Sequence, residues 1–182
     1  MVELSEIQAA YYMVAATGVL VAAAFYIMNL RVSQRALRIN MTNSLLQFYT
    51  SVEGQKVWME LLNMKWKDYD DFEKKYGSDN NIDNYAKRQS VWNVYNNVGK
   101  LLKAGLLDRD TIYNVSSTAP VWMWTKFKPI VEEHRKRYTG KDSQTGFEYV
   151  AGEMLKMILE SDPTYKVPET FAEYIPDKKI VQ

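Results

Sequence analysis

The chain has 182 residues, with 23 basic and 22 acidic side chains and a formal net charge of +1. A nearly neutral chain lacks the excess of basic side chains that is typical of nucleic-acid-binding proteins, so we expect no nucleic-acid partner. The chain contains no cysteine, which excludes a disulfide framework and a thiolate metal site.

The first predicted element is a membrane-spanning helix over residues 7–30. No charged side chain occurs within this segment of 24 residues. At about 1.5 Å of rise per residue it forms a helix of roughly 36 Å, which exceeds a hydrocarbon core of about 30 Å. A secretory signal sequence has basic residues before its apolar segment, whereas here Glu3 and Glu6 precede it. We therefore predict a membrane anchor, preceded by a short external N-terminus over residues 1–6.

Basic residues determine the expected orientation of this anchor. Arg31, Arg35 and Arg38 follow the apolar segment directly, and no acidic residue lies between them and Glu53. No Lys or Arg occurs before Arg31. The positive-inside rule then predicts a single-pass protein of the cell membrane, with its N-terminus outside and its C-terminal domain in the cytoplasm. The same arginines are placed to contact anionic headgroups of the lipid bilayer.

One face of the predicted anchor carries small residues. Ala15, Gly18 and Ala22 follow one another at helical spacing, and small residues allow a second membrane helix to approach closely. We expect this face to bind other integral membrane proteins. Whether copies of the chain also form a homo-oligomer is left open by the pattern.

Apolar residues recur at helical spacing through most of the chain after the anchor. The clearest stripe lies in a predicted helix that Gly105 ends as a left-handed cap, and it consists of Val91, Val94, Tyr95, Val98, Leu101 and Leu102. No stretch alternates apolar and polar residues for long enough to indicate a strand. The predicted fold class is all-α, with a single N-terminal transmembrane helix followed by a small helical domain.

The chain after the anchor falls into three predicted parts. Residues 31–52 are expected to form a juxtamembrane helix that continues from the anchor, with a break near Gly54. Residues 53–160 are expected to form a cytosolic helical domain. Residues 161–182 contain three prolines and are expected to form an extended tail.

The only histidine of the chain is His134, which lies between Glu133 and Arg135. Neighbouring residues point to different sides of a helix, and a zinc site with two histidines is impossible with one. The spacing places His134 at the edge of the apolar face that contains Ile130 and Val131. We therefore interpret it as a structural residue.

The densest acidic cluster consists of Asp68, Asp70, Asp71 and Glu73. It lacks the glycine and the final glutamate of a calcium-binding EF-hand loop, and acidic residues are common at helix N-termini. We therefore interpret the cluster as the start of a helix. The sequence also lacks a glycine-rich phosphate loop and a serine elbow. We predict no catalytic residue, no metal site and no cofactor.

Trp122 and Trp124 lie two positions apart in a helix that is predicted to open at Ala119 and Pro120. Two positions on a helix are about 200° apart, so the two indoles cannot both face one core. One of them should face a second helix, the membrane surface or a partner, and exposed tryptophan is common in protein interfaces. We treat both as candidate partner-binding residues of the cytosolic domain.

Three segments of the chain carry a family resemblance. They run from Trp66 to Phe72, from Val98 to Asp108 and from Trp122 to Arg135. On these motifs the chain resembles a widespread prokaryotic family of unknown function, over most of residues 35–138. The resemblance implies one N-terminal membrane helix followed by a cytosolic helical domain. It brings no known activity or ligand.

The leading hypothesis is a non-catalytic, membrane-anchored interaction protein, either a scaffold or an accessory subunit. Such a protein would hold a partner through its membrane helix and its cytosolic helices. The alternative is a structural subunit packed inside a larger membrane enzyme complex, which copurification with other integral proteins would favour. A second alternative is an enzyme that uses only Asp, Glu, Tyr and Lys side chains, which a deep polar pocket around several carboxylates would support.

Overall fold

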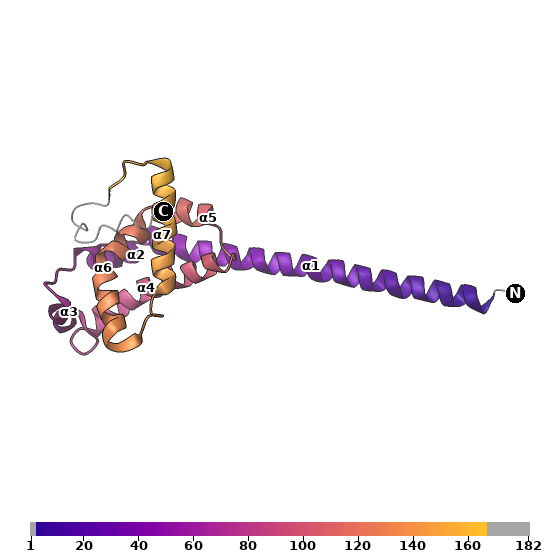
Figure 1. The fold of residues 1–182 in the computed structure, drawn as a ribbon, viewed down its shortest axis with the longest axis horizontal. Coiled ribbons are helices and arrows are strands. Elements are labelled where there is room, and N and C mark those ends of the chain that lie inside the picture. Colours follow the sequence, from indigo (N-terminus) through magenta and orange to yellow (C-terminus); the bar gives the residue numbers. More distant parts are fainter. Residues whose placement is uncertain (1–2, 167–182) are drawn as a thin grey trace. The chain divides into compact units, whose positions relative to one another are not determined.

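The structure, a computed structural model, describes residues 3–166 apart from the side chain of Thr139. All regular elements in this range are helical, which confirms the all-α class. They follow one another along the chain (Figure 1) as α1 (Leu4–Thr50), α2 (Val52–Asn63), α3 (Tyr69–Tyr76), α4 (Ile82–Lys103), α5 (Arg109–Ser116), α6 (Ala119–His134), the short π-helix η1 (Arg135–Thr139) and α7 (Thr145–Ser161). Of the predicted tail, residues 167–182 lie outside the described residues.

The chain divides into two units, of which the first ends at Asn40 and the second begins at Met41. Helix α1 starts in the first unit and continues without a break to Thr50. Every described residue of the first unit is exposed, and none of the most apolar stretch of α1 is buried. Helix α1 is long enough and apolar enough to cross a membrane.

The turn between α1 and α2 falls at Ser51, three residues before the expected break at Gly54. Ser51 is the N-cap of α2, and its hydroxyl accepts a hydrogen bond of 3.0 Å from the Gly54 backbone N–H. A Cβ atom at Gly54 would overlap with the carbonyl oxygen of Phe48 at the end of α1. The glycine therefore allows α2 to begin this close to α1, whereas the serine ends the first helix.

Aromatic side chains from several helices form the core of the second unit. The ring of Phe127 on α6 lies 5.4 Å from that of Trp66 and 5.3 Å from that of Trp92. The ring of Tyr95 on α4 stacks on that of Phe147 on α7 at 4.9 Å. Most of the predicted α4 stripe is buried, namely Val91, Tyr95, Val98 and Leu102, whereas Val94 and Leu101 at its edge are partly buried.

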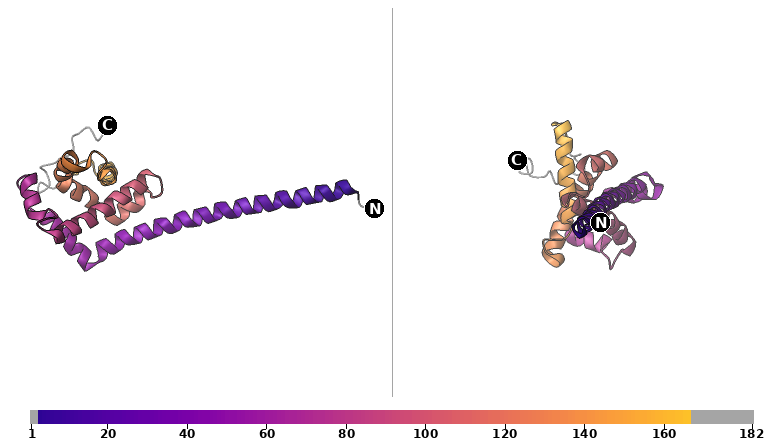
Figure 2. Two further views of the ribbon diagram at one scale, coloured as in Figure 1. Left: turned by 90° about the horizontal axis from the view of Figure 1, so that it is seen from below. Right: turned by 90° about the vertical axis from the view of Figure 1, so that its right-hand side faces the viewer.

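Helices α4 and α7 cross steeply, and Figure 2 shows α7 nearly end-on in the view where α4 lies along the page. Glycines permit the close contact at this crossing, because a Cβ atom at Gly99 would overlap with the carbonyl oxygen of Gly146. The backbone N–H of Gly146 also donates a hydrogen bond of 2.9 Å to Asn96 Oδ1. The two helices thus meet backbone to backbone, without intervening side chains.

We expect Gly99→Ala to destabilise the helical domain strongly. The added methyl group must push α7 away from α4, and overpacking of this kind costs about 3 kcal/mol. For a domain of this size the loss lowers Tm by roughly 10 °C. Thermal unfolding of the full chain in mild detergent, followed by circular dichroism, measures this shift.

Gly152→Ala on α7 is the matched control. A Cβ atom at Gly152 meets no atom within 4 Å, and alanine is the better helix former by about 1 kcal/mol. This variant should unfold at or slightly above the temperature of the wild type. Equal Tm values for the two variants would contradict the backbone contact at Gly99.

Candidate functional site

The residues predicted for the membrane helix face lie on exposed surface of α1. Ala15, Gly18 and Ala22 are exposed, and a Cβ atom built at Gly18 would meet no described atom within 4 Å. Within the part of the chain that the structure describes, nothing packs on this face at Gly18. The face is therefore available to a helix from another chain.

The three arginines after the apolar segment are also exposed on α1. Spacings of four and three residues place Arg31, Arg35 and Arg38 within about 60° on one side of the helix. No acidic residue occurs between Glu6 and Glu53. This side of α1 is therefore positively charged and suited to an anionic surface.

The two tryptophans of α6 point to different sides, as their spacing predicts. Trp124 is only 8% exposed, and its ring lies 5.1 Å from that of Phe147. Trp122 is half-buried, with its ring 6.1 Å from that of Trp58 on α2, and its Nε1 donates a hydrogen bond of 2.8 Å to the Tyr165 hydroxyl. Trp124 therefore belongs to the core, whereas Trp122 lies between α2 and the segment that follows α7.

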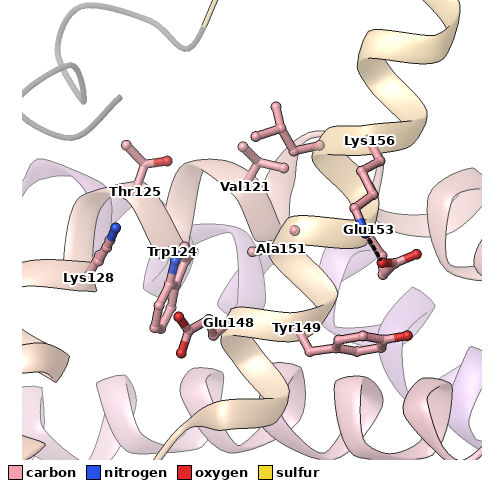
Figure 3. A pocket seen from close by; sticks show the side chains of 11 residues that line it. Val121, Trp124, Thr125, Lys128, Glu148, Tyr149, Ala151, Glu153 and Lys156 are labelled. Atoms are coloured by element: carbon pink, nitrogen blue, oxygen red, sulfur yellow. Dashed lines mark hydrogen bonds and ion pairs between the residues drawn. The ribbon is translucent and has the colours of Figure 1, made fainter. Parts of the chain in front are cut away.

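A groove of about 280 Å³ lies between α6 and α7. Trp124 and Val121 form its apolar side on α6, opposite Ala151 on α7 (Figure 3). This volume is just below the range for ligand pockets, which is roughly 300–1,000 Å³. The groove is thus large enough for one or two side chains of a partner.

Both carboxylates that line the groove take part in ion pairs. Glu153 lies 2.7 Å from Lys156 and 3.6 Å from Arg109. Glu148 lies 2.9 Å from Arg135. The charges at the rim compensate one another, so the groove presents an apolar surface with a neutral border.

The most unusual polar side chain of the domain is Arg88 on α4, which is only 3% exposed. Its guanidinium lies 4.5 Å from the centre of the Phe72 ring and 5.0 Å from that of Trp92. Its Nη2 donates a hydrogen bond of 3.2 Å to the carbonyl oxygen of Tyr76. Burial lowers the pKa of Arg88 to about 10, an effect that the negative charge of Glu73 partly offsets.

Arg88 forms no ion pair within residues 3–166, so cation–π contacts and one carbonyl group provide its main stabilisation. This arrangement connects α3 to α4, because Phe72 and Tyr76 belong to α3. Arg88 therefore has a structural role in the domain.

The predicted helix start at the acidic cluster is confirmed. Asp68 caps α3 by accepting a hydrogen bond of 2.8 Å from the Asp71 backbone N–H. Asp70 accepts a hydrogen bond of 2.6 Å from Arg137 in η1, and Arg137 also donates one of 2.9 Å to Glu133. The cluster thus caps α3 and connects it to η1.

His134 lies half-buried at the end of α6, with its ring 5.3 Å from that of Tyr138. Burial lowers its pKa below the ordinary value, while Glu73 acts in the opposite direction and Arg88 reinforces the lowering. Within residues 3–166 no group of three or more His, Asp or Glu side chains is placed to hold a metal ion.

Sequence reasoning missed Arg88, Gly99 and Gly146. A signal existed for Arg88, which lies three residues before Val91 and so on the buried side of α4. A glycine inside a helical pattern is a weaker signal, because it indicates close packing without naming the partner. The crossing of α4 and α7 had to be seen in three dimensions.

We expect acidification to destabilise the domain through His134. Because its pKa is lowered in the folded state, the unfolded chain takes up a proton first as the pH falls through about 6.5. The contribution of His134 is thus present above that pH and is lost below it. Thermal unfolding between about pH 7.5 and pH 5.5 should show this loss, and His134→Gln should reduce it.

The titration itself can be measured directly. His134 is the only histidine, so its imidazole proton resonances are unambiguous in NMR spectra of the full chain. A titration midpoint at or above the value of an exposed histidine would contradict the effect of burial. The Gln variant should leave the metal content of the purified protein unchanged.

Most of the chain matches the profile of a protein family. The profile of the domain of unknown function DUF4760 matches residues 13–154, and the chain belongs to this family. The matched range includes all three motifs of the resemblance and begins within the apolar segment of α1. No curated protein and no solved structure matches the chain significantly.

Proposed function

We propose that the chain is a non-catalytic, membrane-anchored interaction protein. Residues 7–30 of α1 cross the cell membrane, and the helical domain lies in the cytoplasm. The protein holds an integral membrane partner through the face of Ala15, Gly18 and Ala22. Trp122 and the groove beside Trp124 are the contact candidates on the domain.

One observation carries this proposal, namely the uncovered apolar surface of α1. Its large side chains between Ile7 and Leu30 are exposed on all sides of the helix. Each Val, Leu, Ile or Phe side chain left in water forgoes roughly 1.5–3 kcal/mol of burial free energy. A helix that is apolar on every side requires a membrane or a protein around it. The length of the segment favours a membrane.

Charge supports the orientation. The segment before Ile7 carries Glu3 and Glu6, whereas Arg31, Arg35 and Arg38 follow Leu30. The basic flank belongs on the cytoplasmic side by the positive-inside rule. Anionic headgroups of the inner leaflet add about 1 kcal/mol of attraction for each basic residue near the surface.

The family match supports a role for α1 beyond anchoring. The match begins at residue 13 and so takes in most of the apolar segment together with the domain. Packing on a specific membrane partner also fits the alternative, a structural subunit inside a larger membrane complex. The open face at Gly18 is the observation that favours it.

The orientation predicts the labelling of two single-cysteine variants. The chain has no cysteine of its own, and both Ser5 and Lys141 are exposed. In intact cells, Ser5→Cys should react with a membrane-impermeant maleimide. Lys141→Cys should react only after the membrane is permeabilised. The reverse pattern would contradict the orientation, and labelling of both variants in intact cells would contradict a cytoplasmic domain.

The packing face predicts the effect of Gly18→Leu. The substitution adds bulk without shortening the apolar segment, and a Cβ atom at this position meets no atom of residues 3–166 within 4 Å. It should reduce the complex that is recovered in mild detergent roughly tenfold, while membrane insertion and the fold of the domain persist. Native mass spectrometry of the detergent-solubilised protein measures the complex.

Ala16→Leu is the matched control, because residue 16 lies about 160° from residue 18 around the helix. It makes a similar change on another face and should leave the complex intact. If both variants keep the complex, recognition lies in the helical domain, and Trp122 becomes the next residue to test. If both lose it, the packing face is assigned wrongly.

A further inference from the structure

Large apolar side chains recur every seven residues along one side of α1. Phe25, Val32 and Ile39 follow Gly18 at this spacing, and they are 65%, 66% and 49% exposed. Val32 and Ile39 lie beyond Leu30, where the membrane proposed above no longer covers the helix. Val32 and Ile39 are thus exposed to water, and they lie on the same side of the helix as Gly18.

A second set of residues fills the positions between them. Ala15, Ala22, Asn29 and Ala36 also recur every seven residues, and each lies three residues before a member of the first set. The combined steps of three and four give a repeat of 3.5 residues. A helix with this repeat can keep one narrow face in contact with a second helix of the same repeat along its whole length. We call this face, which contains the eight positions of the two sets, the seam. The small residues allow the two backbones to approach closely.

Asn29 gives the seam its specificity. It is the one polar residue among the eight positions between residues 15 and 39, and it occupies the position that a coiled-coil heptad calls a. A single Asn at an a position specifies the register and the number of strands, because each copy forms a hydrogen bond with its equivalent. This points to a second copy of the chain as the partner, since only an identical helix places Asn29 opposite Asn29.

The charges on α1 are compatible with such a pair. In the same heptad frame Arg31 and Arg38 occupy c positions, which face away from the seam. Arg35 occupies a g position and would lie across from Asn40 of the second copy, so no like charges meet. Two copies inserted in one membrane with the same orientation are also parallel by necessity.

The seven-residue spacing continues into the second unit at positions that its core does not use. The spacing recurs there at Asn43 and Leu46, both exposed, whereas Leu45, Phe48 and Tyr49 occupy other heptad positions and pack in or against the core of the unit. Packing of the domain on these last turns therefore does not use the residues of the seam.

We propose that the seam of α1 from Ala15 to Ile39 binds a second copy of the chain as a parallel, in-register two-stranded coiled coil that extends from the membrane into the cytoplasm. The proposal deepens the proposed function, because it names the partner of the face at Gly18. It also accounts for the stretch between Leu30 and Met41, which is exposed on all sides in the single chain. Isolated helices of this length are marginal in water, and a second strand stabilises them.

The absence of native cysteines allows a direct test by disulfide cross-linking. Val32→Cys and Ile39→Cys place a thiol on the seam, whereas Gln34→Cys and Leu37→Cys place one on exposed positions outside it. In membranes treated with a mild oxidant, the two seam variants should form covalent dimers at least roughly fivefold faster than the two controls. Equal rates at all four positions, or no dimer at the seam positions, would overturn the proposal.

The register of the two helices can be tested by expressing two cysteine variants together. Differently tagged Val32→Cys and Ile39→Cys chains, expressed together, should form dimers with their own kind but not with each other. Frequent mixed dimers would overturn the in-register arrangement. The same mixture carrying Asn29→Leu should gain mixed dimers, because the polar pair that fixes the register is gone.

The membrane proposal and the dimer proposal fail in different ways. Alkaline extraction of the same membranes shows whether each variant is embedded in the bilayer, independently of cross-linking. Embedded chains that do not cross-link at the seam would overturn only the dimer. Native mass spectrometry in mild detergent completes the test, since one chain, or three or more, would also overturn a pair.

Discussion

The backbone contact between Gly99 and Gly146 is the constraint on which the helical domain depends. It brings α4 and α7 closer than any side chain between them would allow. At this separation the ring of Tyr95 stacks on that of Phe147, and the ring of Trp124 on α6 makes a T-shaped contact with Phe147. The three helices thus meet at the ring of Phe147.

The last turns of α1 join this framework through a buried polar contact. The hydroxyl groups of Tyr49 and Tyr95 form a hydrogen bond to each other, next to the apolar contacts of Leu45 and Phe48. Burial raises the pKa of Tyr95 to about 12 and that of Tyr49 in the same direction. Both hydroxyls therefore stay protonated, and the end of α1 is attached to the domain by a neutral pair in the core.

Periodicity predicted the elements of this fold but not their partners. The stripe from Val91 to Leu102 predicted α4, and the spacing of Trp122 and Trp124 predicted that they diverge, without showing which of them is buried. Which of the two tryptophans is buried depends on the positions of Phe147 and Trp58, and these follow from the tertiary structure. Helix α6 continues through Pro129 to His134, although proline removes a backbone hydrogen bond inside a helix. Tertiary packing on both faces of α6 outweighs one missing backbone hydrogen bond.

The side-chain amide of Asn29 distinguishes between lipid and a second protein helix as the surroundings of α1. Lipid tails satisfy apolar side chains equally well on every side of the helix, so they explain the apolar composition but not a particular seam. A buried amide without a hydrogen-bond partner loses roughly 2–7 kcal/mol relative to water. Lipid tails provide no such partner, whereas an identical helix provides one at the same depth. Val32 and Ile39 are exposed where the bilayer has ended, and a second helix would bury part of their apolar surface. A second copy of the helix, as proposed above, would therefore suit both ends of the seam.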